Sequence, residues 1–220
     1  MDGRALTFRL AGINNQNFLM RDEETGTWWQ QVSGKALFGP LKGRVLEPVV
    51  SDELTFAQWK QESPDGQVLA PSQKYQGKYE DNWEPEVAKL PTVIDFPGTG
   101  LKARDVIMGI ERNGVSRAYP FDAALAQSPI QDRVGGDPIV LLVGPDKKSV
   151  RAFHSRIEGS DVELFRSGEQ LVDSSGNSWD FKGCATAGPL QGKCLEQIAI
   201  LKDYWFDWRN YHHDTSIYRH

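Results

Sequence analysis

Two cysteines are the residues whose type and spacing could most directly do chemistry. Cys184 and Cys194 flank residues 188–192, which read Gly-Pro-Leu-Gln-Gly and are typical of a tight hairpin turn. Residues that face each other across a hairpin can reach the Cα separation of a disulfide. Two states therefore stay open: a disulfide, or two buried thiols in a reducing compartment. The spacing excludes a Cys-x-x-Cys redox centre.

The densest group of metal-ligating side chains is His212-His213-Asp214. Adjacent residues on a strand point to opposite faces, so these two imidazoles would make a poor metal pair without further ligands. We therefore expect a solvated or capping role for the three residues, and no bound cofactor.

Four carboxylates also invite an acid–base interpretation: Asp22, Glu47, Asp173 and Glu196. They occupy matched positions of an internal repeat. A catalytic pair need not be duplicated, whereas a residue that holds a turn or an ion pair must be. We interpret all four as structural. The chain has no Walker loop, nucleophile elbow, zincin helix or dinucleotide fingerprint, so no catalytic residue can be assigned.

The repeat supplies the elements that must position these residues. Adding 149 to positions 34–69 gives positions 183–218, and ten of the 36 pairs are identical, where average composition predicts about two. Upstream the register shifts by two, so that Asp22 and Trp28 align with Asp173 and Trp179. The repeated residues of the hairpin and the following helix are Gly39, Pro40, Leu41, Gly43 and Trp59 in the first copy, and Gly188, Pro189, Leu190, Gly192 and Trp208 in the second.

Each copy is predicted to contain an acidic turn, a Trp-bearing strand, the glycine hairpin and a short helix. In the helix, Phe56 and Trp59, or Trp205 and Trp208, are three residues apart on one face. A last strand is expected near Val68 or Ile217. Large aromatic side chains that recur in this way favour core packing, and we expect Trp29 and Trp83 to be the exposed exceptions.

The chain is predicted to be mainly β, a β-rich α+β fold made of two homologous units. Residues 1–69 form the first repeat, residues 70–104 a surface connector, and residues 105–220 the central hairpins with the second repeat, packed with the first into one body. Asn113-Gly114 indicates a two-residue hairpin. Residues 121–127 are a short helix, and residues 139–143 and 150–154 are a further strand pair.

The first copy is less complete than the second. Strands between residues 138 and 156 precede the second copy, whereas the first begins at Gly3, which aligns with Gly159. An open edge of unpaired backbone groups would invite pairing with another chain. We therefore expect a protein partner, or self-association, at the edge of the first repeat.

Composition excludes some partners. The chain has 25 Lys and Arg against 30 Asp and Glu, a net charge of -5, and no basic run, so a nucleic-acid partner is disfavoured. Its most apolar stretch, residues 138–143, is far shorter than a membrane-spanning helix. Residues 1–4 show no signal-peptide pattern, so the protein is cytoplasmic or its signal has been removed. The cysteine pair favours a periplasmic or extracytoplasmic location.

Several phrases resemble the family known as domain of unknown function 3179. In that family a Cys-x-x-Cys segment usually precedes the phrase that begins here at Asp2, so that segment would lie before Met1. The resemblance covers nearly the whole chain and implies thiol or metal chemistry. The matching phrases are Asp22-Glu23-Glu24-Thr25-Gly26-Thr27-Trp28, Gly39-Pro40-Leu41-Lys42-Gly43, Arg117-Ala118-Tyr119-Pro120, Val134-Gly135-Gly136-Asp137-Pro138 and Tyr204-Trp205-Phe206-Asp207-Trp208.

Two functional hypotheses follow. The first is a non-catalytic binding or scaffold protein that presents a β-rich surface to a protein partner. The alternative is a metal- or thiol-dependent redox protein that acts through His212, His213 and Asp214 or through the pair Cys184 and Cys194.

Overall fold

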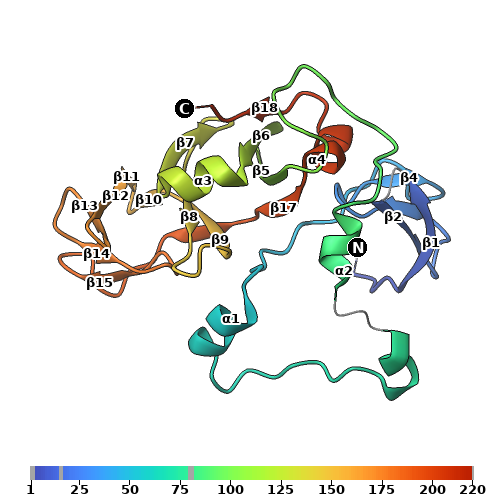
Figure 1. The fold of residues 1–220 in the computed structure, drawn as a ribbon, viewed down its shortest axis with the longest axis horizontal. Coiled ribbons are helices and arrows are strands. Elements are labelled where there is room, and N and C mark those ends of the chain that lie inside the picture. Colours follow the sequence, from blue (N-terminus) through green and yellow to red (C-terminus); the bar gives the residue numbers. More distant parts are fainter. Residues whose placement is uncertain (1–2, 15–16, 79–81, 220) are drawn as a thin grey trace.

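A computed structural model describes residues 3–14, 17–78 and 82–219. The chain is β-rich, as predicted, with short helices (Figure 1). Four of its sheets have four strands each. None of the helices among the described residues is long and apolar enough to span a membrane.

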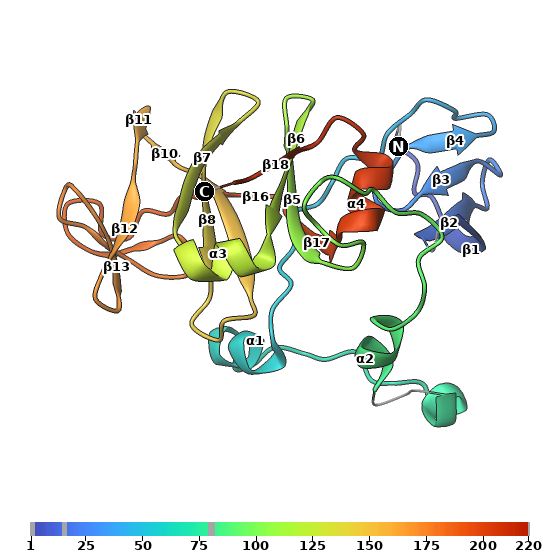
Figure 2. The ribbon, with the colours of Figure 1, turned by 45° about the horizontal axis from the view of Figure 1, so that its top comes forward.

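Two sheets at opposite ends of the molecule share one topology (Figure 2). Both are antiparallel meanders with the strands in chain order. The N-terminal sheet contains β1 (Phe8–Asn14), β2 (Asn17–Asp22), β3 (Trp28–Gln30) and β4 (Ala36–Phe38). The C-terminal sheet contains β12 (Leu164–Ser167), β13 (Gln170–Asp173), β14 (Ser178–Trp179) and β15 (Ala185–Ala187). The likeness is one of topology, and the predicted duplication stays a prediction.

Two further sheets form the middle of the molecule. In the β8 sheet the order is β16-β9-β8-β7, and in the β5 sheet it is β17-β5-β6-β18. The strands of the β8 sheet are β7 (Ile130–Val134), β8 (Asp137–Val143), β9 (Val150–His154) and β16 (Glu196–Ile198). The strands of the β5 sheet are β5 (Val106–Arg112), β6 (Val115–Pro120), β17 (Leu201–Tyr204) and β18 (Ser216–Ile217). A small ribbon pairs β10 (Arg156–Ile157) with β11 (Ser160–Asp161).

The core lies on both faces of the β8 sheet. Along β8, Ile139 and Leu141 belong to an apolar cluster shared with β5, β6 and β7, whereas Val140 and Leu142 belong to a second cluster shared with the C-terminal sheet. Successive strand residues point to opposite faces. A strand that is covered on both faces must be apolar throughout, which explains the run of apolar residues seen in the sequence.

The short helices are α1 (Phe56–Glu62), α2 (Trp83–Val87), α3 (Phe121–Gln127) and α4 (Trp205–Tyr211), with a 3-10 helix η1 (Gln73–Lys78). Helix α4 packs on β5 at Gly109, where a Cβ atom would lie 2.3 Å from the Trp208 ring. Glycine is therefore required at this point of the strand. Helix α3 and the two hairpins of the centre match the predicted ranges, and Asn113 and Gly114 have the positive φ of a type I′ turn.

The segments that follow the two end sheets meet in the middle of the molecule. After the C-terminal sheet, the chain pairs with β9 and then, through β17, with β5. After the N-terminal sheet, Glu53 bridges to Val150 of β9, and α1 follows. Glu53 and Lys202, which are 149 residues apart, meet in an ion pair of 3.4 Å. The two end units are thus joined through one central body.

The expectations for Trp29 and Val68 were wrong. Trp29 is fully buried, because its ring packs edge-to-face on Phe8 at 5.9 Å and its indole N–H donates to Asp22. No strand forms at Val68, whose side chain is 65% exposed. Ile217 does form the expected strand, because β6 offers it a parallel partner. Trp83 is exposed, as predicted.

The aromatic residues of the two short helices differ in burial. Trp205 and Trp208 of α4 are buried in the core, as predicted. For Phe56 of α1 the same expectation was wrong, because its side chain is 63% exposed. The connector of residues 70–104 carries η1 and α2 and runs as an open loop outside the sheets (Figures 1 and 2).

Candidate functional site

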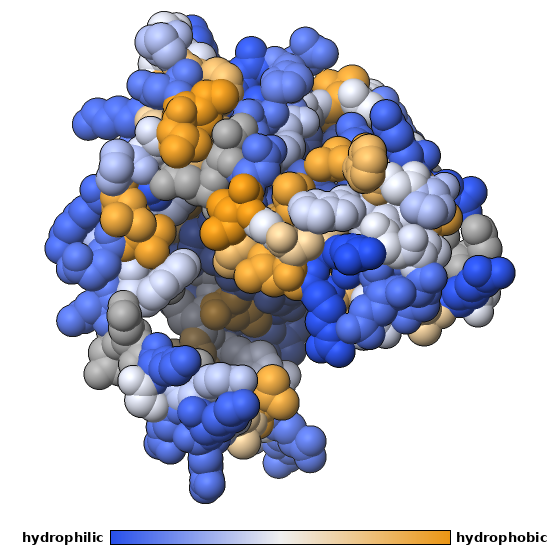
Figure 3. All heavy atoms as spheres, turned by 90° about the vertical axis from the view of Figure 1, so that its right-hand side faces the viewer, coloured by the Kyte–Doolittle hydropathy of each residue, from blue (hydrophilic) through white to orange (hydrophobic). Residues whose placement is uncertain are grey.

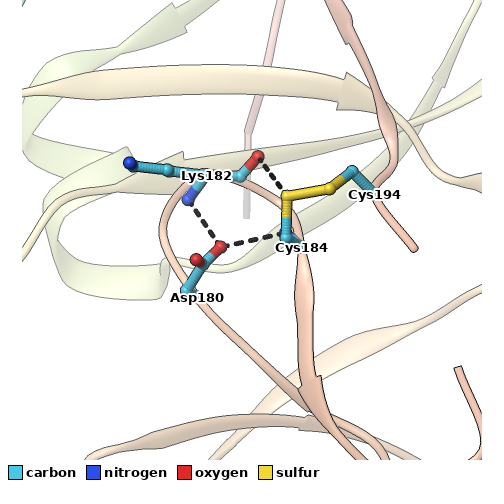
Figure 4. The surroundings of a disulfide bond; sticks show 4 residues. All are labelled: Asp180, Lys182, Cys184 and Cys194. Carbon is cyan, nitrogen blue, oxygen red and sulfur yellow. Dashed lines mark hydrogen bonds between the residues drawn. A yellow bond between two sulfur atoms is a disulfide. The ribbon is translucent and has the colours of Figure 1, made fainter. Parts of the chain in front are cut away.

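Cys184 and Cys194 form a disulfide, which resolves the two states left open by the sequence. They face each other across the hairpin that follows β14, with Cα atoms 4.0 Å apart. The carboxylate of Asp180 accepts hydrogen bonds from the backbone N–H groups of Lys182 and Cys184 and so shapes the turn beside them (Figure 4). Disulfides are typical of extracytoplasmic proteins. The equivalent pair in the N-terminal sheet is Lys35 and Val45.

The three residues of the histidine cluster do not converge. His212 caps the C-terminal end of α4, stacks on Trp208 with ring centroids 3.6 Å apart, and places Nε2 3.2 Å from Glu111. Burial lowers the pKa of His212, against the opposing effects of the Trp208 carbonyl and Glu111. His213 and Asp214 are exposed. In the described ranges, no three His, Cys, Asp or Glu residues are grouped so that they could hold a metal ion.

Asp22 and Asp173 hold equivalent turns in the two end sheets. Asp22 accepts hydrogen bonds from the indole N–H of Trp29 at 2.8 Å and from the hydroxyl of Thr25, and Asp173 accepts from Trp179 at 3.0 Å. Burial alone would raise the pKa of each carboxyl, but these donors lower it below its usual value. Glu47 and Glu196 are exposed. The four carboxylates therefore do not come together as a pair.

The repeated glycines at 39 and 188 have a related structural cause. Both have positive φ, and a Cβ at Gly39 or Gly188 would lie 2.8 or 2.6 Å from the acidic turn. The hairpin therefore packs directly on that turn, where the backbone N–H of Leu190 donates to the side chain of Asn177. Gly-Pro-Leu-x-Gly is a packing motif in this chain rather than a phosphate cradle.

Trp29, rather than Trp28, occupies the position of Trp179. The reason is that each of the two turns before the hairpin is one residue longer in the N-terminal sheet. The difference in residue number between equivalent positions is therefore 151 at Asp22 and Asp173, 150 at Trp29 and Trp179, and 149 at Lys35 and Cys184. An alignment of the two sequence segments without gaps therefore places Trp28, and not Trp29, opposite Trp179. In the N-terminal sheet these turns are closed by hydrogen bonds from Asp22 N to Thr27 O and from Gln30 N to Lys35 O. In the C-terminal sheet the corresponding bonds run from Asp173 N to Asn177 O and from Asp180 N to Cys184 O.

The two end sheets differ in how they are covered. The Trp179 face of the C-terminal sheet packs on Val140, Leu142 and Phe153 of the β8 sheet. None of the three apolar clusters among the described residues includes a residue of the N-terminal sheet. The strands that precede the second copy therefore cover a face of its sheet and do not extend its edge. Among the described residues β1 and β12 are both edge strands, so the expected open edge of the first sheet is found in both end sheets. The N-terminal sheet differs in that it shares no apolar cluster with the rest of the described residues.

Apolar side chains are exposed on the N-terminal sheet and its hairpin. Ile13 and Phe18 face each other across β1 and β2, and Figure 3 shows apolar residues gathered on this side of the molecule. The exposed fractions are 64% for Leu10, 65% for Ile13, 47% for Phe18, 42% for Leu37, 71% for Phe38 and 51% for Val45. Apolar patches of this kind mark interaction surfaces.

A buried polar cluster joins the N-terminal sheet to α4. The side-chain amide of Asn17 donates to Asp207 Oδ2 at 2.9 Å, and Gln30 donates to Asn17 Oδ1 at 3.0 Å. Asp207 is only 7% exposed, and within the described ranges its Oδ1 has no hydrogen-bond partner. Burial raises the pKa of Asp207, and burial together with Asp207 raises the pKa of Asp203 to about 7.

This cluster was not predicted from the sequence. The available signal was a carboxylate between Phe206 and Trp208, two large aromatic residues of the predicted helix, because such a group must be paired or protonated when it is buried.

A second buried ionic cluster holds α1. Arg151 is 4% exposed and donates to Asp52 at 2.7 and 2.8 Å and to Glu62 at 2.8 and 3.0 Å. Its guanidinium also lies 4.7 Å from the centroid of the Phe181 ring. Hydrogen bonds from Arg151 lower the pKa of Asp52 and Glu62. The four hydrogen bonds fasten α1 and the segment before it to β9.

One family model, described as Protein of unknown function (DUF3179), matches residues 1–215. No curated protein and no solved structure matches the chain.

Proposed function

The chain belongs to the DUF3179 family, and from that premise we propose that it is a non-catalytic binding or scaffold protein whose N-terminal sheet docks on a protein partner. A single contrast supports this proposal most strongly. The C-terminal sheet packs its tryptophan face on the β8 sheet. The N-terminal sheet, of the same topology, shares no apolar cluster with the rest of the described residues and leaves Leu10, Ile13 and Phe18 exposed around the buried Trp29.

The chemistry of the surface indicates the kind of partner. Its exposed side chains are aliphatic and aromatic, and those of Ile13 and Phe18 are adjacent. Apolar side chains of this size supply the buried centre of protein–protein interfaces. The proposal places the protein outside the cytoplasm, because its one pair of cysteines is oxidised.

Replacing Phe18 with lysine tests the proposal. A photo-crosslinking residue placed at position 37 first identifies the partner in cells that produce the protein, and the purified partner is then titrated against each variant. We expect Phe18→Lys to weaken binding by about tenfold or more, because it places a charge in an apolar contact.

Phe165 provides a matched control. Its side chain is also 47% exposed, but it lies on β12 of the C-terminal sheet. Phe165→Lys should leave binding unchanged. Equal affinity of the Phe18→Lys variant and the wild-type protein would contradict the proposal, and so would a purified chain with no crosslinked partner that sediments as a monomer.

The exposure of Cys194 favours a second candidate function, in thiol–disulfide exchange. An exposed sulfur can be attacked by an external thiolate. An external dithiol would pass two electrons and two protons to Cys184 and Cys194 and would itself become a disulfide. Equilibration with dithiothreitol and its oxidised form tests this. A bond that stays intact below about -300 mV is structural and excludes the exchange reaction.

A further inference from the structure

The attachment of the N-terminal sheet to the rest of the molecule depends on polar contacts. Within the described residues, no apolar core cluster includes this sheet. Its links to α4 include the hydrogen bond from Asn17 to Asp207 at 2.9 Å and the bond from the Tyr211 hydroxyl to the carbonyl of Asn14 at 3.3 Å. The state of Asp207 therefore affects how the sheet is held.

Asp207 lies in surroundings that do not neutralise a negative charge. Asn17 donates to it from the sheet and is uncharged, the equally uncharged Gln30 donates to Asn17, and Tyr211 lies on the same helix as Asp207. Asp203 of β17 repels it, and Glu53, from the segment before α1, repels Asp203 in turn. The lysine beside these acids, Lys202, is paired with Glu53.

Two more titratable groups lie further along the joint. His212, at the end of α4, is next to Glu111 and experiences the charge of Lys35 from the sheet. Lys35 and Glu111 thus affect the charge state of His212. The Oδ1 atom of Asp207, in contrast, has no hydrogen-bond partner among the described residues. A buried carboxylate oxygen without a donor favours the protonated acid.

Helix α1 shows that a charge is not needed at this position of the helix. Residue 58 lies 149 positions before residue 207 and is glutamine, a neutral side chain of similar shape. Gln58 is also buried, and it donates to Glu62 within its own helix. An ionisable group at position 207 is therefore a specific property of the α4 joint.

We propose that Asp207 and Asp203 form a proton-binding site that determines how firmly the N-terminal sheet is attached to α4. With a proton bound, the Asn17 hydrogen bond is kept and no buried charge is left unpaired. When the proton leaves, the charge on Asp207 is opposed by Asp203, and water must enter the joint to solvate Oδ1. This inference does not depend on the identity of any partner of the sheet.

The direction of the pH dependence follows from linkage. Both carboxyls have a pKa that is raised in the folded protein, to about 7 for Asp203. A raised carboxyl pKa gives a stabilisation that is complete below the unfolded pKa and is lost as pH rises through the folded pKa. The joint is therefore tight near pH 6 and loose near pH 8, and its opening should increase about tenfold across that interval.

Hydrogen–deuterium exchange of the full chain tests the proposal. Exchange of residues 17–30 is compared with that of residues 139–143 in β8, in wild type and Asp207→Asn, at pH 6 and pH 8. We expect exchange of the sheet in wild type to rise about tenfold relative to β8 after correction for intrinsic rates. Asp207→Asn should be protected at both pH values. Asp214→Asn, an exposed acid with the same change of charge, should behave like wild type.

A second measurement covers the case in which Asp207→Asn does not fold. Carboxyl carbon NMR of the wild-type protein should show two Asp resonances whose pKa lies above the usual value of an Asp side chain, and their absence would overturn the proposal. An unchanged pH profile in Asp207→Asn would also overturn it. Calcium alone, added at pH 8, should not restore protection; if it does, the site binds a cation rather than a proton.

Discussion

At the scale of single residues, buried polar side chains decide most of the local geometry. Asp22 and Asp173 each bind an indole N–H and the backbone of an acidic turn, and the glycine hairpin then packs on that turn. Arg151 and Asp207 are likewise buried, but the first is saturated by two carboxylates and the second is not. The saturated groups stabilise the fold, and the unsaturated one is where a change of state can act.

Asp173→Asn tests the role of the turn carboxylate. The new amide N–H₂ would face the donors of Trp179 and Asn177, so we expect the free energy of unfolding to fall by about 1–3 kcal/mol. Denaturant unfolding at pH 7 measures this loss. Because hydrogen bonds lower the pKa of Asp173 in the folded protein, its stabilisation is lost as pH falls through that pKa, and the two proteins should converge in acid.

The control for this substitution is Asp214→Asn, which removes the same charge from an exposed position. Its unfolding free energy should stay within about 0.5 kcal/mol of wild type. A stability of Asp173→Asn equal to that of the control would show that the turn does not depend on the carboxylate.

At the scale of elements, the same hairpin is closed differently in the two end sheets. Cys184 and Cys194 form a disulfide at the position where Lys35 and Val45 make an isolated backbone bridge. The backbone arrangement is shared, and only the second copy has a covalent link. The second sheet is also the one that packs on the β8 sheet.

Cysteines introduced at positions 35 and 45 should therefore form a disulfide. We expect Lys35→Cys/Val45→Cys to close spontaneously under oxidising conditions and to raise the free energy of unfolding, because the link restricts the unfolded chain. Intact mass with and without alkylation detects the bond. Free thiols after oxidation would show that the two hairpins are not equivalent.

Removal of the natural link gives the reciprocal measurement. Cys184 and Cys194 are separated by ten residues, and closing a loop of that size stabilises a protein by about 2–3 kcal/mol. Cys184→Ser/Cys194→Ser should lose this amount, and the wild-type protein in reductant should match it.

At the scale of the whole molecule, the two end sheets are joined to the central sheets by the chain segments that follow them. The segment after the N-terminal sheet pairs with β9 through the bridge from Glu53 to Val150. Ion pairs of Arg151 with Asp52 and Glu62 then hold α1 in place. The segment after the C-terminal sheet continues through β17 and α4 into the core. The first unit is thus attached by polar contacts and the second by apolar ones.

Arg151→Met tests this difference. Removing the guanidinium leaves two neighbouring carboxylates without a counter-ion, and the loss of one partner from a buried ion pair costs about 3–5 kcal/mol. We expect α1 to detach, with increased hydrogen–deuterium exchange over residues 56–62. Arg9→Met, which removes an exposed pair with Glu23, should leave stability and the exchange of α1 unchanged. Unchanged protection of α1 would refute the assigned role of Arg151.

Local pattern was sufficient to predict several elements from the sequence. Asn113-Gly114 specifies its hairpin through positive φ, residues 121–127 form the expected helix, and the apolar run after Pro138 is a strand buried on both faces. The recurring Gly-Pro-Leu-x-Gly motif marks a hairpin in each copy, because it reflects a close contact within a single short segment.

Tertiary structure alone decided which faces are covered and which polar groups meet. Trp29 is adjacent to Trp28 in sequence, yet it is the buried one, because its indole N–H donates to Asp22 and its ring packs on Phe8. Asn17 and Asp207 are 190 residues apart and form a buried hydrogen bond. Neither result can be obtained from local periodicity, because burial depends on what packs against a residue from elsewhere in the chain.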